Sequence, residues 1–314
     1  MTVNVSSAAA NASGANTTAA NTSNALDAHR WRSPLLGECR TVELDAGPIE
    51  YFERGDGPVL VLAHGWLANA NLWRNVVEEL AGDFRCITLD LPLGSHRVAM
   101  NAGADLGPKG CGKLISDAIA ALGLDEVTLV GNDSGGAYSQ IATASQPDRI
   151  VRLVLNSCET PFDEFPPPPF DGLPAIAEDP ATLGRLFEAL RDREVRSTPA
   201  AYGLLIKHAI DELVSDSYAL PCLADGDILR DTAKAMASAT SAPVHDAGGH
   251  LIAAFERPVL LAWGPEDRVF PLAHAERYAN ELTDGRVELI PDAFSFTPED
   301  QPRLLADALA HFCI

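Results

Sequence analysis

A carboxylate flanked by glycines is the residue of this chain whose setting most directly indicates chemistry. Asp133 stands in the stretch Gly131-Asn132-Asp133-Ser134-Gly135-Gly136, after an apolar run at 126–130 and before a helix-like segment at 137–143. A strand, a sharp turn and a helix form a nucleophile elbow, which lifts its central side chain into a site while small neighbours relieve crowding. The pattern therefore predicts that Asp133 is a carboxylate nucleophile.

Ser134 is the alternative nucleophile, because it is the next residue along the chain. Its flanking positions would be Asn132 and Gly136, and Asn132 has a bulky amide where the turn needs a small residue. Asp133 has Gly131 and Gly135 in those places, so it fits the turn better. We place Asp133 at the nucleophile position and keep Ser134 as the second possibility.

More polar residues follow other predicted strands. The turn His64-Gly65-Trp66 comes directly after the apolar run 59–63, and Asp267 lies in Gly264-Pro265-Glu266-Asp267 after the run 259–263. Glu159 lies shortly after the run 152–155. Parallel strands gather their carboxyl ends at one edge of a sheet, so residues at those ends can share a site.

On the elbow and the His-Gly turn, residues 40–314 resemble the α/β-hydrolase family. The similarity is to the branch with aspartate at the elbow, which includes haloalkane dehalogenases, fluoroacetate dehalogenases and epoxide hydrolases. The resemblance implies an α/β fold with a mostly parallel eight-stranded sheet, helices on both of its faces, and an inserted helical cap. It also implies a cofactor-independent enzyme in which the cap shapes the substrate pocket.

The resemblance assigns roles to several residues. The His64–Gly65 turn, with the backbone N–H groups of Trp66 and Ser134, would form an oxyanion or leaving-group site. The Trp66 indole could donate to a halide, but packing under the cap is the preferred interpretation. Asp267 would be the acid that orients a catalytic histidine.

Some dehalogenases place this acid at the position of Glu159, although a solvated loop residue is the preferred interpretation there. Dehalogenases usually carry a second tryptophan directly after the nucleophile, where this chain has Ser134.

The usual catalytic histidine is missing from the sequence. Its position falls on Ser295, and the loop 291–302 contains no histidine, whereas a serine of ordinary pKa cannot act as a base near neutral pH. His96 is a possible substitute, since it follows the predicted strand 84–90. His245 and His250 are weaker candidates, and we interpret His208 and His274 as helix-surface residues.

The hydrophobic periodicity predicts the elements that must position these side chains. An α/β core at 29–160 and 256–314 would enclose a helical cap at 161–255, which Pro166–Pro169 introduces, and a disordered tail would occupy 1–28. A core helix is expected at 113–122, and cap helices at 181–191, 200–210 and 227–237. Strands are expected at 41–45, 49–53, 59–63, 84–90, 127–130, 152–155, 259–263 and 287–290.

The amino-acid composition restricts the classes of partner that the protein is expected to bind. The net charge of -21 disfavours nucleic acid and anionic membranes. No residue pattern calls for a metal or cofactor, and the six scattered cysteines indicate free thiols in a reducing, cytoplasmic setting. The expected partner is a small apolar substrate, while oligomeric state is not indicated.

Three functions fit these observations. The first is a hydrolase acting on a small apolar halide, epoxide or ester with an atypical base. The second is a non-hydrolytic enzyme (lyase, cyclase or isomerase) on the same scaffold. The third is a catalytically silent homologue that binds a small ligand. The elbow favours the first function, and the substitution by Ser295 favours the other two.

Overall fold

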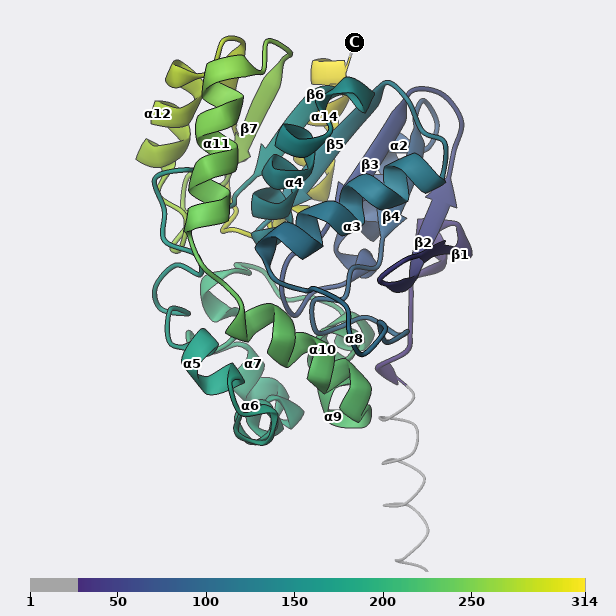
Figure 1. Ribbon diagram of the computed structural model, residues 1–314, viewed down its shortest axis with the longest axis vertical. Coiled ribbons are helices and arrows are strands. Elements are labelled where there is room, and N and C mark those ends of the chain that lie inside the picture. The colour runs from purple at the N-terminus through teal and green to yellow at the C-terminus, as the bar shows by residue number, and fades with distance from the viewer. Residues whose placement is uncertain (1–27, 314) are drawn as a thin grey trace, which may run out of the picture.

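The computed structural model describes residues 28–313 and has one eight-stranded sheet at its centre (Figure 1). Its strands are β1 (Glu38–Leu44), β2 (Gly47–Arg54), β3 (Val59–Ala63), β4 (Arg85–Leu89), β5 (Val127–Asn132), β6 (Ile150–Asn156), β7 (Val259–Trp263) and β8 (Gly285–Leu289). Their order in the sheet is β1-β2-β4-β3-β5-β6-β7-β8. Only β2 pairs antiparallel with its neighbours β1 and β4, so the predicted mostly parallel sheet is confirmed.

Continuous apolar runs made the central strands predictable. The runs at 59–63 and 259–263 match β3 and β7 to the residue, and the other predicted strands overlap the observed ones. Every residue of β5 is buried, as expected for a strand covered by helices on both faces of the sheet. This burial explains why the pattern lacks the alternation of a strand with one wet face.

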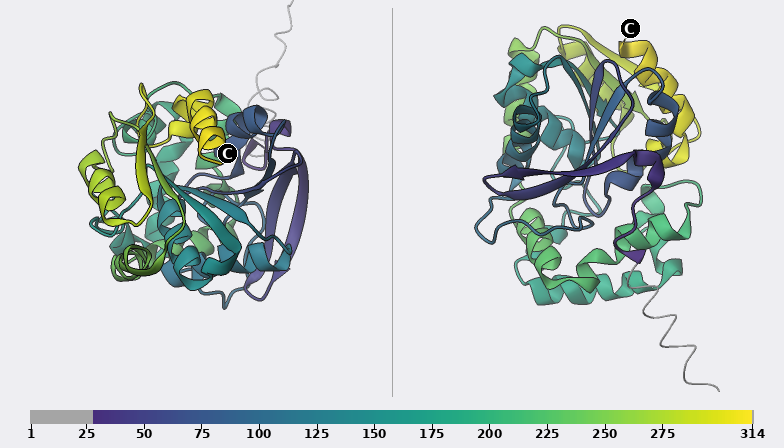
Figure 2. Two further views of the ribbon diagram at one scale, coloured as in Figure 1. Left: turned by 90° about the horizontal axis from the view of Figure 1, so that it is seen from above. Right: turned by 90° about the vertical axis from the view of Figure 1, so that its right-hand side faces the viewer.

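Helices cover both faces of the sheet. On one face lie α3 (Pro108–Ala121), α4 (Ser134–Ser145) and α11 (Ala242–Ala254), with α4 between the other two (Figure 1). The opposite face carries α2 (Arg74–Leu80) and α14 (Pro302–Cys313), which pack on each other (Figure 2). α12 (Leu272–Glu281) packs on β7 and β8, and the short α13 (Thr297–Asp300) leads into α14.

Short helices lie beneath the carboxyl edge of the sheet, in the segment between β6 and β7 (Figures 1 and 2). They share a second apolar cluster that contains Leu183, Phe187, Ile228 and Met236. These helices are α5 (Leu173–Ala177), α6 (Pro180–Glu188), α7 (Arg193–Arg196), α8 (Glu212–Ala219), α9 (Pro221–Ala224) and α10 (Gly226–Ala237).

The predicted helix at 200–210 is wrong. The segment holds only a single 3-10 turn, Tyr202–Leu204. The backbone N–H groups of Lys207 and His208 donate instead to the carboxylate of Asp300, 2.9 Å from its Oδ1 in both cases. A distant side chain thus takes the hydrogen bonds that a helix would have used, and His208 lies on a loop rather than on a helix surface.

The predicted domain boundaries remain predictions. The tail predicted at 1–28 lies outside the described residues, apart from Ala28. Within the predicted cap at 161–255, α11 packs beside α4 against the sheet, whereas α5 to α10 lie beneath its edge. Between residues 28 and 313, no helix combines the length and apolarity needed to cross a bilayer.

Candidate functional site

Asp133 occupies the turn between β5 and α4. Its backbone has φ 54° and ψ -142°, which is the strained left-handed geometry of an elbow, and Ser134 already begins the helix. The chain at Gly65 approaches it so closely that a Cβ there would lie 2.2 Å from Asp133 Oδ1. Gly65 is therefore required at this position, because any side chain would displace the carboxylate.

The Asp133 carboxylate lies among backbone donors. The N–H of Ser134 donates to Asp133 Oδ1 at 2.5 Å, and the N–H of Trp66 also lowers its pKa as a donor. Burial has the larger, opposite effect and, together with the charge of Asp267, raises the pKa of Asp133 to about 6. The N–H of Trp66 also donates to Ser134 Oγ at 2.9 Å, so the predicted oxyanion donors do converge beside the elbow.

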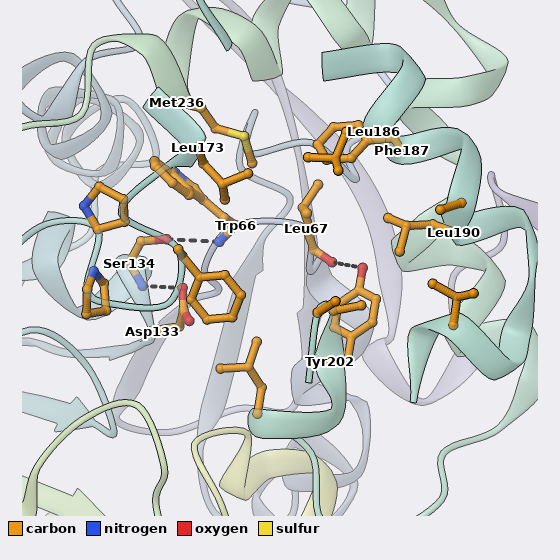
Figure 3. Close-up of a pocket in the computed structure, with 18 of the residues that line it drawn as sticks. Trp66, Leu67, Asp133, Ser134, Leu173, Leu186, Phe187, Leu190, Tyr202 and Met236 are labelled. Atoms are coloured by element: carbon orange, nitrogen blue, oxygen red, sulfur yellow. Dashed lines mark hydrogen bonds between the residues drawn. The ribbon is translucent and has the colours of Figure 1, made fainter. Parts of the chain in front are cut away.

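A cavity of about 170 Å³ opens in front of the elbow. Asp133, Ser134 and Trp66 lie at one end of it, and Leu186, Phe187 and Leu190, from α6 and the turn that follows it, lie at the other (Figure 3). An empty apolar cavity of roughly 150 Å³ already holds a molecule the size of benzene. The other lining residues are mostly apolar: Leu67, Glu159, Pro166, Pro167, Phe170, Leu173, Ala189, Val195, Ala200, Ala201, Tyr202, Leu205, Met236 and Phe270.

Glu159 is a second carboxylate in this cavity, and interpreting it as a solvated loop residue was wrong. It is only 2% exposed, and its Oε2 atom is buried without a hydrogen-bond partner. Burial, followed by the negative charge of Asp133, raises the pKa of Glu159 well above its usual range. Its place just beyond a parallel strand was the available signal, because ligand sites gather at carboxyl ends of such strands.

Asp267 and Ser295 lie together, but neither lines the cavity. Asp267 Oδ1 accepts hydrogen bonds from the N–H groups of Val269 (2.8 Å) and Phe270 (2.9 Å) and from Ser295 Oγ (2.7 Å). Burial nevertheless raises the pKa of Asp267, and its Oδ2 atom is buried without a partner.

The loop of Ser295 does reach the elbow, as the resemblance implies. The Ser295 carbonyl oxygen accepts from Asn132 Nδ2 at 2.9 Å, one residue before Asp133. The side chain at the position predicted for the histidine therefore carries a small hydroxyl group that donates to Asp267.

The Trp66 side chain has a partner that the sequence did not indicate. Its Nε1 donates to the Tyr138 hydroxyl at 2.9 Å, and its ring packs on Phe165 with a centroid separation of 5.5 Å. The indole N–H is thus engaged with α4 rather than aimed at a leaving group. The preferred interpretation, packing under the cap, describes its surroundings.

His64 is buried and does not line the cavity. Its Nε2 accepts from the N–H of Leu91 at 2.9 Å, and its Nδ1 lies 2.8 Å from the carbonyl oxygen of Gly65. Burial lowers the pKa of His64 to about 4, so the ring is neutral near pH 7. The imidazole therefore joins the loops after β3 and β4 and positions Gly65 and Trp66 from behind.

None of the eight histidines, all of which fall within residues 28–313, lines the cavity. The predicted substitute base His96 is buried elsewhere, with its Nε2 3.5 Å from Asp231 Oδ2 on α10. His245 Nε2 contacts the carbonyl oxygen of Asp163 at 2.7 Å, and His250 is exposed on α11. The contact with Asp231 on α10 thus accounts for His96, and no imidazole lines the cavity with Asp133.

A metal site does not form either. Across residues 28–313, no three His, Cys, Asp or Glu side chains gather in an arrangement that would hold a metal ion. The chemistry available at the cavity is therefore that of two carboxylates, backbone N–H donors and an apolar wall. That set can perform nucleophilic attack, proton transfer and oxyanion stabilisation.

Comparisons with known proteins agree with this architecture. Haloalkane dehalogenase 2 of Mycobacterium tuberculosis is 24% identical over 296 residues, which cover 87% of this chain and 93% of that protein. A solved α/β-hydrolase fold protein from Burkholderia ambifaria has a TM-score of 0.73 at 21% identity, covering 87% of this chain and 97% of that one.

A solved epoxide hydrolase has a TM-score of 0.70 at 18% identity and covers 88% of this chain and 98% of that one. A family model described as the alpha/beta hydrolase fold matches residues 58–302. With the sheet, the elbow and the loops around it in their places, the chain belongs to the α/β-hydrolase fold family.

Proposed function

We propose that this protein hydrolyses a small apolar electrophile through a covalent ester on Asp133. The observation that carries the proposal is the Asp133 carboxylate at a strained turn, at the wall of an apolar cavity, with the Ser134 N–H donating to its Oδ1 atom. Such a carboxylate attacks carbon and forms an ester, which water then cleaves. The N–H groups of Trp66 and Ser134 would hold the oxyanion formed when water attacks the ester carbonyl.

Protonation supports Asp133 over Ser134 as the nucleophile. The pKa of Asp133, about 6, leaves its carboxylate mostly ionised at neutral pH. The Ser134 hydroxyl has no imidazole beside it to take its proton, because no histidine lines the cavity. A serine nucleophile without a base is not activated, whereas a carboxylate needs no activation.

The cavity wall supports the substrate class. Apolar side chains from the cap and the loops surround the elbow, and no lysine or arginine lines the cavity. A neutral, small and apolar molecule matches this wall, while an anionic substrate would lose its hydration without gaining a counterion. Halides, epoxides and esters are all neutral electrophiles of this kind, and the dehalogenase and epoxide hydrolase relatives act in the same chemical range.

One observation favours a second candidate. Ser295 stands where the family usually has its base, and its hydroxyl is committed to Asp267. If nothing else activates water, the ester on Asp133 would accumulate. The protein would then be a non-hydrolytic enzyme (a lyase, cyclase or isomerase) or a binder of small apolar ligands.

Intact-protein mass spectrometry after exposure to a panel of alkyl halides, epoxides and esters tests the proposal. We expect a mass increase equal to the transferred group, located on the peptide that contains Asp133, together with product beyond one equivalent per protein. Product limited to one equivalent would select the second candidate.

The matched variants are Asp133→Asn and Ser134→Ala. Asparagine tolerates the positive φ of the turn, so Asp133→Asn keeps the elbow while lowering turnover at least about 10³-fold. Ser134→Ala retains the adduct on Asp133. An adduct on Ser134, or turnover that survives in Asp133→Asn whose amide is intact by mass, contradicts the proposal.

A further inference from the structure

Two carboxylates face the cavity, and one of them has an oxygen with no partner. Glu159 Oε2 is buried and receives no hydrogen bond, although the side chain lines the same cavity as Asp133. Of the other hydroxyl groups in the lining, that of Tyr202 donates to the Leu67 carbonyl oxygen at 2.9 Å, and that of Ser134 forms a hydrogen bond with Asp133 that lowers the pKa of the Asp133 carboxyl group. Glu159 is thus the lining group whose proton is free to move to a bound molecule.

The surroundings of the two carboxyl groups separate their proton affinities. Burial and the nearby charge of Asp133 raise the pKa of Glu159 well above its usual range. The N–H groups of Ser134 and Trp66 hold Asp133 closer to its ionised form, with a pKa of about 6. Asp133 is therefore mostly ionised at neutral pH, while burial and the charge of Asp133 favour the protonated form of Glu159, which is the division of roles expected of an acid and a nucleophile.

The same cavity is poorly suited to a halide leaving group. A departing halide needs N–H donors rather than a proton. The Trp66 indole N–H is occupied by the Tyr138 hydroxyl, and Ser134 stands directly after the nucleophile. A departing epoxide oxygen, by contrast, needs a proton, because an alkoxide is a poor leaving group. Because a proton is available and the indole N–H is not, the site favours an oxygen leaving group over a halide.

We propose that Glu159 is the acid and base of this site and that its substrate class is an epoxide. The inference rests on the proposed nucleophilic role of Asp133. In the first step an Asp133 oxygen attacks an epoxide carbon and the C–O bond of the ring breaks. The released ring oxygen takes the proton of Glu159. The products are a hydroxyalkyl ester on Asp133 and an ionised Glu159.

In the second step Glu159 recovers its proton from water. The resulting hydroxide attacks the carbonyl carbon of the Asp133 ester, and the oxyanion faces the N–H groups of Trp66 and Ser134. The intermediate collapses by breaking the acyl C–O bond, and the diol oxygen takes the remaining acid proton of Asp133. The sum is epoxide plus water to diol, with Asp133 ionised and Glu159 protonated as at the start.

The two half-reactions of Glu159→Gln test this proposal directly. Rapid quenching followed by intact mass spectrometry measures how fast the ester forms and how fast it disappears. Butylene oxide and n-butyl iodide are matched probes, because iodide departs without a proton. In Glu159→Gln we expect ester formation from butylene oxide to slow by about 10²–10⁴-fold, and ester formation from the iodide to stay within about threefold. Hydrolysis of the hydroxyalkyl ester should also slow, because it needs the ionised Glu159 that ring opening leaves behind.

Glutamine matches a protonated glutamate in size and charge, and alkylation by the iodide reports that the site is intact. Tyr202→Phe is the control for the rival proton donor, and we expect it to leave the ratio of the two alkylation rates unchanged. Equal slowing of both probes by Glu159→Gln, or wild-type rates in both half-reactions, overturns the proposal. So does a selective loss with epoxide in Tyr202→Phe alone. Failure of wild-type protein to form an ester on Asp133 with either probe refutes the proposed function itself.

Discussion

Acidic residues lie along the carboxyl edge of the sheet from β5 to β8, and the two ends of this stretch differ in structure. At the β5–β6 end, Asp133 and Glu159 line the cavity. At the β7–β8 end, Asp267 and Ser295 lie behind it and hydrogen-bond to each other. Both ends carry buried carboxylates with raised pKa values. Access to the cavity, rather than residue type, separates them.

Asp267 and Glu159 differ in the hydrogen bonds that their carboxylates accept, and this difference shows that the acid expected to assist catalysis can serve as a structural support. Asp267 Oδ1 takes three hydrogen bonds from its own loop and the next, which fixes the conformation of both. Each of the two side chains keeps one buried oxygen without a partner, but only Glu159 lines the cavity. We infer that proton transfer has moved toward β6, while the β7–β8 end acts as a support.

We expect the largest difference in kcat between variants of the two acids, Glu159 and Asp267. Glu159→Gln should lower kcat by about 10²–10⁴-fold, whereas Asp267→Asn should stay within about tenfold of wild type. The physical reason is that only Glu159 lines the cavity. Steady-state kinetics with butylene oxide measures both variants. A larger loss in Asp267→Asn than in Glu159→Gln would break the comparison.

The pH dependence of kcat/KM should report the ionisation of both carboxyl groups at the β5–β6 end, those of Asp133 and Glu159. Asp133 must be ionised, so the rate should fall about tenfold per unit below pH 6, while loss of the Glu159 proton should lower it on the alkaline side. The charge of Asp267 raises the pKa of Asp133, so Asp267→Asn should move the acid limb to lower pH. An unmoved limb would show that the two ends do not interact.

Substitutions of Asp133 and Asp267 should change the free energy of unfolding in opposite directions. The folded-state pKa of Asp133 lies above its unfolded value, so the folded protein binds more protons and loses stability as pH rises from about 4 to about 6. Asp133→Asn should therefore raise the free energy of unfolding at pH 8 by about 1–3 kcal/mol. Asp267→Ala should lower it by about 2–4 kcal/mol, because it leaves buried donors without an acceptor.

Urea unfolding of both variants at pH 5 and pH 8 measures these changes. The gain in Asp133→Asn should shrink at pH 5, where the wild-type carboxyl is mostly protonated. A destabilised Asp133→Asn at both pH values would contradict the account of the elbow.

We expect the smallest effect from substitution of Ser295, which stands at the position predicted for the usual histidine. Ser295→Ala removes one hydrogen bond to Asp267 and should lower the free energy of unfolding by about 1 kcal/mol. Turnover should change by less than about threefold, since Ser295 does not line the cavity. A large loss of kcat in this variant, with the fold intact by circular dichroism, would make Ser295 part of the reaction.

The sequence alone was sufficient for the sheet and for the elbow. Apolar runs such as β3 and β7 indicate buried parallel strands, and Gly131 and Gly135 stand two positions before and two positions after Asp133. These signals are local, because burial on both faces of a strand and a tight turn each restrict residue types within a few positions.

Only the tertiary structure decided which side chains share the site. The partner of the Trp66 indole is Tyr138, 72 residues away, and the donors bound by Asp300 are 92 and 93 residues away at His208 and Lys207. The burial of Glu159 beside Asp133 likewise depends on how the cap covers the sheet edge. Hydrogen-bond partners and burial arise from segments that meet only in space, so the place of Glu159 after a strand could indicate a site position but not the burial of its side chain.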